Sequence, residues 1–150
     1  MVDTVRFDQD VRLHVYRRFV ETGQPPTVTQ TAEALGSLVP DVEAAYLRLA
    51  QNRVLVLDPG SLRIRMAMPF SADPTAFRVE ATGHNWWANC AWDALGVPAL
   101  WAGDATIFSR CGDCEEPLTL IVERGVLGKT SAVCHFTVPA VHWWDDIDFT

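Results

Sequence analysis

Cys90 and Asp93 are the residues whose types and spacing most directly suggest chemistry. They stand three positions apart in Cys-Ala-Trp-Asp, so a helix would carry the thiol and the carboxyl on one face, about one turn apart. A thiolate is the softest ligand that a protein offers to a metal, and a neighbouring carboxyl could move a proton to or from the same ligand. On spacing alone, the structural alternative is preferred, in which Cys90 is a small buried side chain and Asp93 a surface carboxylate.

A second group of thiols follows at Cys111-Gly-Asp-Cys114. Together with Cys134 and either His135 or His142, this Cys-x-x-Cys motif has the donor types of a tetrahedral structural zinc site. The chain has one such motif, and the spacing to the other donors is loose. We therefore do not expect structural zinc, and we interpret the two histidines as strand residues with satisfied hydrogen bonds.

Positioning Cys90 beside Asp93 requires a helix, which the sequence predicts from Trp86 to Leu95. Asn85 is a suitable N-cap, and Gly96 with Pro98 would end the helix. The strands expected around this helix cover residues 76–82, 105–111, 117–122 and 131–138.

The predicted helix has electrostatic consequences for both side chains. Cys90 near its N-terminus would experience the positive end of the helix dipole, which lowers a thiol pKa. Asp93 would lie among Trp86, Trp87 and Trp92, and such apolar surroundings favour the neutral carboxyl, so it could act as a general acid. Trp143 and Trp144 are interpreted as core or interface residues rather than as part of a substrate pocket.

The first half of the chain predicts a small helical module. Helices are expected over 8–22, over 27–35 and from Pro40 onward, and the third is expected to bury Val42, Tyr46, Leu47 and Leu49. Strands over 53–57 and 62–68 follow, joined by Asp-Pro-Gly-Ser. Three helices and a hairpin predict a winged-helix-like module over residues 1–72. A small β-rich unit carrying one catalytic helix would follow over residues 73–150, which makes the fold class α+β.

A winged helix often binds DNA, but this one lacks the charge for it. The third helix, where recognition residues would lie, offers Arg48 against Asp41 and Glu43, whereas phosphate contacts require several basic side chains. The basic residues of the wing are only Arg53, Arg63 and Arg65. We therefore expect a scaffold or lid rather than a DNA-binding domain.

Composition narrows the class of protein further. The 150 residues are 49% hydrophobic and 21% charged, which is ordinary for a globular protein, and no apolar run reaches the roughly 20 residues of a membrane helix. Residues 76–150 hold 4 basic and 10 acidic side chains, so nucleic acid and anionic membranes are not expected partners. The N-terminus, Met-Val-Asp-Thr-Val-Arg-Phe, lacks a secretory signal, which predicts a cytoplasmic protein with reduced thiols.

The region around Cys90 resembles the alkylmercury (organomercurial) lyase family. The resemblance rests on Trp-Ala-Asn-Cys-Ala-Trp-Asp-Ala-Leu-Gly-Val-Pro-Ala-Leu at residues 87–100, followed by Ala-Thr-Ile-Phe-Ser-Arg-Cys at 105–111 and Pro-Leu-Thr-Leu-Ile-Val at 117–122. It implies that Cys90 and Asp93 are the catalytic cysteine and aspartate of the family, and that Cys111 matches a structural cysteine. Cys114 departs from the family pattern. The family also has a winged-helix-like N-terminal module.

Members of this family use a second cysteine, which has no clear match here. Cys134 lies in a predicted strand and could be mistaken for it, whereas residues 142–150 resemble the approach to the strand that carries it. Two alternatives follow: the chain is a C-terminally shortened version, or this member works without the second thiol.

The resemblance implies a role in mercury resistance, in which a small organomercurial is cleaved to hydrocarbon and Hg(II). No organic cofactor is expected, Hg(II) is the bound product, and a mercuric-ion acceptor protein or small thiols would receive it. The alternative is a thiol-based metal-binding or metal-sensing protein that has no lyase turnover. In that protein the winged helix would transmit the signal of metal binding. A paired carboxyl at Asp93 has no use in mere sequestration, so the enzyme is preferred.

Overall fold

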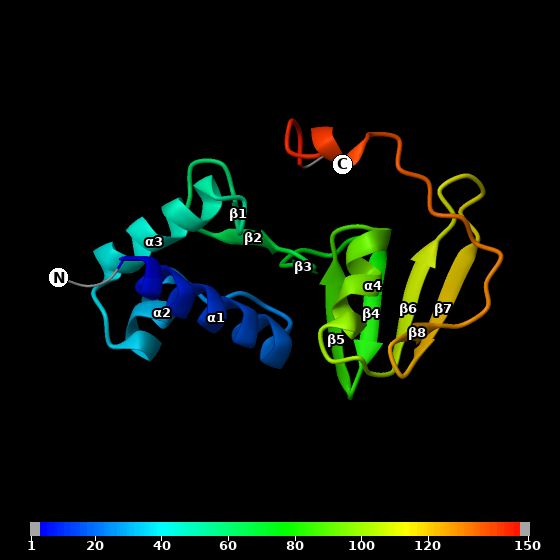
Figure 1. The fold of residues 1–150 in the computed structure, drawn as a ribbon, viewed down its shortest axis with the longest axis horizontal. Helices are drawn as coiled ribbons and strands as arrows, with labels where there is room; N and C mark the ends of the chain where they lie inside the picture. Colours follow the sequence, from blue (N-terminus) through cyan, green and yellow to red (C-terminus); the bar gives the residue numbers. More distant parts are fainter. Residues whose placement is uncertain (1–3, 148–150) are drawn as a thin grey trace.

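The computed structural model describes residues 4–147, so the outermost residues of the two predicted units lie outside the described part. Within that part the protein is an α+β chain in which helices lie beside and over one antiparallel sheet (Figure 1). Its helices are α1 (Thr4–Thr22), α2 (Val28–Leu35), α3 (Val39–Gln51), α4 (Ala91–Ala99) and the short 3-10 helix η1 (Ala140–His142). Its strands are β1 (Val56–Leu57), β2 (Ile64–Ala67), β3 (Phe70–Ser71), β4 (Phe77–Ala81), β5 (His84–Ala88), β6 (Ala105–Arg110), β7 (Pro117–Glu123) and β8 (Val126–Leu127).

The three N-terminal helices form where local signals predict them. Thr27 caps α2 by accepting a hydrogen bond from the Gln30 N–H at 3.2 Å, while the Gln30 side chain accepts from the Thr27 N–H at 2.9 Å. Gly36 ends the helix with φ +60°, a backbone conformation that glycine adopts without strain. The predicted inward position of Leu47 is wrong, because that side chain is 50% exposed and Ala45 is buried on the inner face instead.

One sheet runs through the whole molecule in the order β1-β2-β3-β5-β4-β6-β7-β8, and every neighbouring pair is antiparallel. The predicted hairpin of the first half is present as β1 and β2. Strand β3 contains two residues, yet it pairs with β2 on one side and with β5 on the other. The hairpin of the N-terminal module and the strands of the second half are therefore joined through β3.

The predicted helix over 86–95 is wrong in its first half. Residues His84–Ala88 form β5, which pairs along its full length with β4, and α4 begins only at Ala91. Trp86 and Ala88 are buried while Trp87 between them is half-buried, an alternation typical of a strand. The helix also continues through Gly96 and Pro98 to Ala99 instead of ending at Gly96.

Aromatic packing joins α1 to the sheet. The ring of Phe70 on β3 stacks on Phe19 of α1 with 5.3 Å between centroids, and the buried Trp86 indole N–H donates to the Phe19 carbonyl oxygen at 2.8 Å. One hydrophobic core accordingly contains residues from both halves, from Val11 on α1 to Val122 on β7.

The C-terminal segment crosses back over the sheet without forming a strand. The strand predicted over 131–138 is wrong, since these residues have no strand partner and are mostly exposed. The segment instead passes over α4 toward the N-terminal module, where the Arg53 guanidinium lies 5.4 Å from the centroid of the Trp144 ring (Figure 1). Among the described residues, no helix is long and apolar enough to cross a membrane.

Candidate active site

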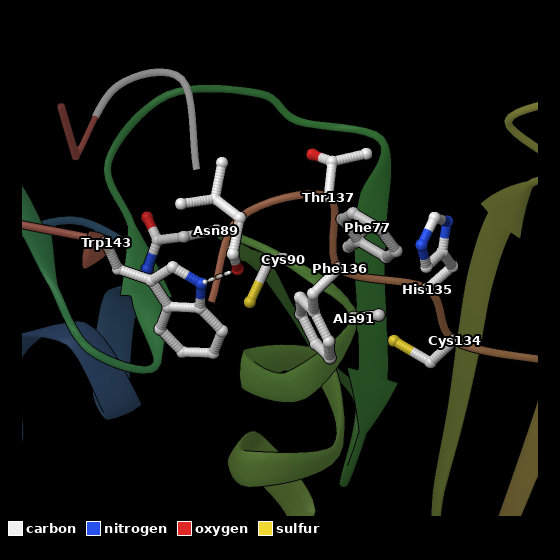
Figure 2. Close-up of a pocket in the computed structure, with 10 residues that line it drawn as sticks. Phe77, Asn89, Cys90, Ala91, Cys134, His135, Phe136, Thr137 and Trp143 are labelled. Carbon is white, nitrogen blue, oxygen red and sulfur yellow. Dashed lines mark hydrogen bonds between the residues drawn. The ribbon is translucent and has the colours of Figure 1, made fainter. Parts of the chain in front are cut away.

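A pocket of about 220 Å³ opens where β5 ends and α4 begins. The register pairs Ala88, the last residue of β5, with Phe77, the first residue of β4, so both strand ends reach the same edge. The irregular C-terminal segment forms the remaining wall (Figure 2). The pocket is lined by Phe77, Asn89, Cys90, Ala91, Cys134, His135, Phe136, Thr137, Val138 and Trp143.

Cys90 is the N-cap residue of α4 and has an extended backbone, with φ −150°. Its thiol does not make a capping hydrogen bond, and burial raises its pKa, with the charge of Asp93 acting in the same direction. The N–H groups of Asp93 and Trp92 act against this rise but are the weaker influence. The predicted lowering of the Cys90 pKa by the helix dipole is therefore wrong, because desolvation outweighs it.

Asp93 lies one helical turn after Cys90 and is half-buried. Burial raises the pKa of its carboxyl, as expected from the sequence, and the hydrogen bond from Asn89 only partly opposes this. Of the three tryptophans expected around this carboxyl, Trp86 is buried in the core, Trp87 is half-buried on β5 and Trp92 is 66% exposed, so Trp92 does not shield it.

Asn89 is a site residue that the sequence analysis missed. Its side-chain N–H₂ donates to the Asp93 carboxylate at 2.9 Å and faces the Phe70 carbonyl oxygen at 3.3 Å. Within residues 4–147 its buried Oδ1 has no hydrogen-bond partner. Asn89 thus links the pocket, which it lines, to the carboxyl behind it. The available signal was its place directly before Cys90, at the end of a strand.

Cys134 lies in the same pocket as Cys90, although 44 residues separate them in the chain. The thiol of Cys134 is close enough for its charge to contribute to the raised pKa of Cys90. In Figure 2 the ring of Phe136 lies between the two sulfur atoms. The structure thus supplies a second thiol within the described chain, at the residue that the sequence analysis set aside.

Aromatic side chains form the apolar part of the pocket, but they are not those predicted. Phe77 comes from β4, whereas Phe136 and Trp143 come from the C-terminal segment. The rings of Phe136 and Trp143 lie 5.2 Å apart, and the Trp143 indole N–H donates to the Val138 carbonyl oxygen at 2.8 Å (Figure 2). Trp143 is therefore a pocket residue rather than a core residue.

The donors considered for zinc do not come together. Cys111 and Cys114 lie on the turn between β6 and β7, and Cys134 lies in the pocket with His135. No group of three or more histidine, cysteine or acidic side chains with the geometry of a metal site occurs in the described range. Among the residues that the structure describes, Cys111, Cys114 and Cys134 therefore do not form one cluster.

The arginines considered for DNA binding are engaged within the chain. Arg48 makes a bidentate ion pair with Asp8 on α1, with Nε to oxygen at 2.9 Å. On the wing, Arg63 pairs with Asp58 at 2.8 Å and also with Asp73. These carboxylates balance much of the positive charge that a phosphate backbone would need.

The cysteines should differ in their reactivity toward a thiol-alkylating reagent. Hydrogen bonds from Cys114 and the Asp113 N–H lower the pKa of Cys111, whereas burial raises that of Cys90. Because the thiolate is the nucleophile, iodoacetamide near neutral pH is expected to modify Cys111 before Cys90, and the Cys90 rate should keep rising to higher pH. Peptide mass spectrometry at timed intervals measures both rates. Faster modification of Cys90 at neutral pH contradicts its assigned environment.

A pocket lined by two thiols, with a desolvated carboxyl linked to it through Asn89, defines a protein suited to thiol-dependent chemistry on a soft ligand. A sequence profile of the alkylmercury lyase family matches residues 70–150, which is more than half of the chain. The chain therefore belongs to the alkylmercury lyase family, whose members are carbon–mercury lyases.

The fold comparison agrees with this assignment. The chain is similar to a solved structure described as the mercury-bound form of MerB2, with a TM-score of 0.64 and 23% sequence identity. The similarity covers 87% of this chain and 68% of that one, so the two share their fold. A search of curated protein sequences found no match.

Proposed function

We propose that this protein cleaves the carbon–mercury bond of small organomercurials by protonolysis, using Cys90, Asp93 and Cys134. The observation that carries the proposal is the meeting of two thiols from distant segments at one pocket, with a half-buried carboxyl linked to it through Asn89. The aromatic walls suit an alkyl or aryl group on the mercury.

Cys90 binds the mercury atom first. Mercury is a soft acid, so its affinity for sulfur offsets the raised pKa of Cys90, and the thiol loses its proton when the bond to the metal forms. Asp93 lies one turn away and has a raised pKa, so it can take up this proton and hold it.

Asp93 then delivers the proton to the carbon bound to mercury. The electron pair of the carbon–mercury bond stays with that carbon and forms the new carbon–hydrogen bond, so the products are the hydrocarbon and Hg(II). The amide of Asn89 holds the carboxyl in place throughout, through its 2.9 Å hydrogen bond. Asn89 is in this sense a positioning residue.

Cys134 acts as the second thiolate, which holds the inorganic ion after cleavage. Phe136 lines the pocket together with both thiols and is drawn between them in the view of Figure 2, so we expect its ring to move when both thiolates bind one ion. The surrounding residues are irregular and exposed, so such a movement breaks no strand pairing.

The N-terminal half supports the catalytic unit, and the mercuric ion leaves the protein after cleavage. Residues 1–72 serve as a winged-helix-like scaffold for the catalytic unit at 73–150, and α1 supports β5 through the hydrogen bond from Trp86 to the Phe19 carbonyl oxygen. Hg(II) leaves to small thiols or to an acceptor protein. All four cysteines are free thiols, as this chemistry requires, and thiols stay reduced in the cytoplasm, which is where we place the protein.

Benzene release from phenylmercury, measured by headspace gas chromatography with excess monothiol present, tests this function. The wild-type protein is expected to turn over, whereas Cys134→Ser is expected to be slower by at least about tenfold, a loss seen even for groups that only support a metal ligand. Ser131→Ala, an exposed change on the same segment, is the matched control and should keep the wild-type rate. No benzene from the wild type, or an unchanged rate in Cys134→Ser, contradicts the proposed site.

A further inference from the structure

The turn between β6 and β7, residues Cys111–Cys114, carries two free thiols three positions apart. The Cys114 side chain and the N–H groups of Asp113 and Cys114 all donate toward the sulfur of Cys111. Backbone hydrogen bonds close the turn, from the Glu115 N–H to the Cys111 oxygen at 3.0 Å and from the Cys111 N–H to the Glu116 oxygen at 2.9 Å. The two sulfurs are thus held as a pair.

This pair is open to solvent. Cys114 is exposed, Cys111 is half-buried, and a side chain added at Gly112 would meet nothing within 4 Å. Three acidic side chains lie in or directly after the turn: Asp113, Glu115 and Glu116. Their negative charge favours a cation at the pair over an anion.

Sheet topology places the pair at the same end of the molecule as the pocket. Arg78 of β4 pairs with Phe108 of β6, so β6 ends at the edge where β4 begins and β5 ends. Cys90 follows β5 and Cys111 follows β6, with only β4 between these strands. Because neighbouring strands lie about 4.8 Å apart, the two strands are about 10 Å apart. Figure 1 shows the β6–β7 turn at the end of the sheet from which α4 starts.

The number of ligand atoms that the turn offers distinguishes between zinc and mercury. Zinc in structural sites requires four ligands, and no third donor with suitable geometry joins the pair among the described residues. A mercuric ion is satisfied by two thiolates, and thiolates are the ligands that soft ions prefer. The pair is therefore complete for mercury but incomplete for zinc.

We propose that Cys111 and Cys114 form a second mercury(II) site, at which the ion is held by two thiolates on the surface. Binding itself needs no lyase activity, and only the source of the ion rests on the proposed function. Transfer from the pocket is ligand exchange without redox change: two mercury–sulfur bonds to Cys90 and Cys134 break while two to Cys111 and Cys114 form. The two protons that the surface thiols release balance those that the pocket thiols regain.

Mercury stoichiometry tests the site separately from the lyase. The full-length protein is reduced, loaded with mercuric chloride, passed through buffer containing excess monothiol, and analysed by native mass spectrometry. The wild type is expected to retain two ions per chain, and both Cys111→Ser/Cys114→Ser and Cys90→Ser/Cys134→Ser are expected to retain one. Asp113→Asn, which keeps both thiols of the turn, should retain two.

The outcomes separate the two hypotheses. If Cys90→Ser/Cys134→Ser retains no ion, or if its single ion persists when Cys114→Ser is added, the surface pair is not a site. Neither result depends on benzene release, which reports on the pocket alone. A different combination of results is also informative. If Cys90→Ser/Cys134→Ser retains one ion while the wild type releases no benzene, the surface site is supported and the proposed lyase activity is contradicted. Cys111→Ser and Cys114→Ser lie on the turn between β6 and β7, and serine is nearly the size of cysteine at all four positions, so circular dichroism is expected to show an unchanged fold.

Discussion

Cys90→Ser is expected to reduce benzene release from phenylmercury to the background rate. A hydroxyl cannot replace a soft thiolate as a mercury ligand, and no other thiol lies at the start of α4. Serine is nearly the same size as cysteine, so the pocket should keep its shape. The rate is measured under single-turnover conditions with protein in excess, because binding of substrate at other thiols then cannot mask the loss.

Trp92→Phe provides the matched control for this experiment. Trp92 is two residues from Cys90 but points to solvent and does not line the pocket, so its replacement should leave the rate unchanged. Benzene release by Cys90→Ser at more than a few per cent of the wild-type rate would exclude Cys90 as the primary ligand.

Asp93→Asn is expected to bind the organomercurial at Cys90 but to release benzene about 10²-fold more slowly or worse, which is the usual scale for loss of a general acid. Asparagine keeps the size of the side chain and lacks an acidic proton. Mass spectrometry of the quenched reaction should find phenylmercury on the peptide that contains Cys90. Glu33→Gln, which removes an exposed carboxylate from α2, is the charge-matched control.

The pH dependence distinguishes a proton donor from a structural carboxylate. Burial raises the pKa of Asp93, so its acid form persists to higher pH than that of an exposed aspartate. As pH rises through that pKa the acid form is lost, and the wild-type rate of bond cleavage should fall, whereas Asp93→Asn should lack this dependence. Equal rates for the two proteins at pH values below that pKa, where the wild-type carboxyl is protonated, show that Asp93 does not transfer the proton.

The sequence predicts best the elements whose signals are local. The helix expected over 27–35 is present as α2, because its capping box at Thr27 and its terminating glycine at Gly36 lie directly at its ends. Strand β5 was mistaken for a helix because its backbone conformation depends on pairing with β4, which the aromatic residues at 86 and 87 do not reveal by themselves.

In the candidate site, too, the sequence predicts local relationships but not the contacts between distant segments. Cys90 and Asp93 are three residues apart, so the sequence brings them together. Cys134 reaches the pocket through an irregular segment that has no periodic pattern, and only the tertiary structure places it beside Cys90. The direction of the Cys90 pKa shift was mispredicted for a related reason. The sequence shows that Cys90 lies near a helix start, whereas its burial depends on the tertiary structure, including the C-terminal segment that lines the pocket.

The pairing of β3 with both β2 and β5 limits where such a chain can be divided or recombined. A cut or recombination point between residues 72 and 73 would leave β5 as an edge strand, with unpaired backbone groups beside the indole of Trp86, and such edges promote aggregation. Gene fusion or exchange at this boundary would thus produce chains that aggregate, and aggregated chains offer no folded half on which selection for a new role could act. Each half therefore shields a sheet edge that the other would leave open.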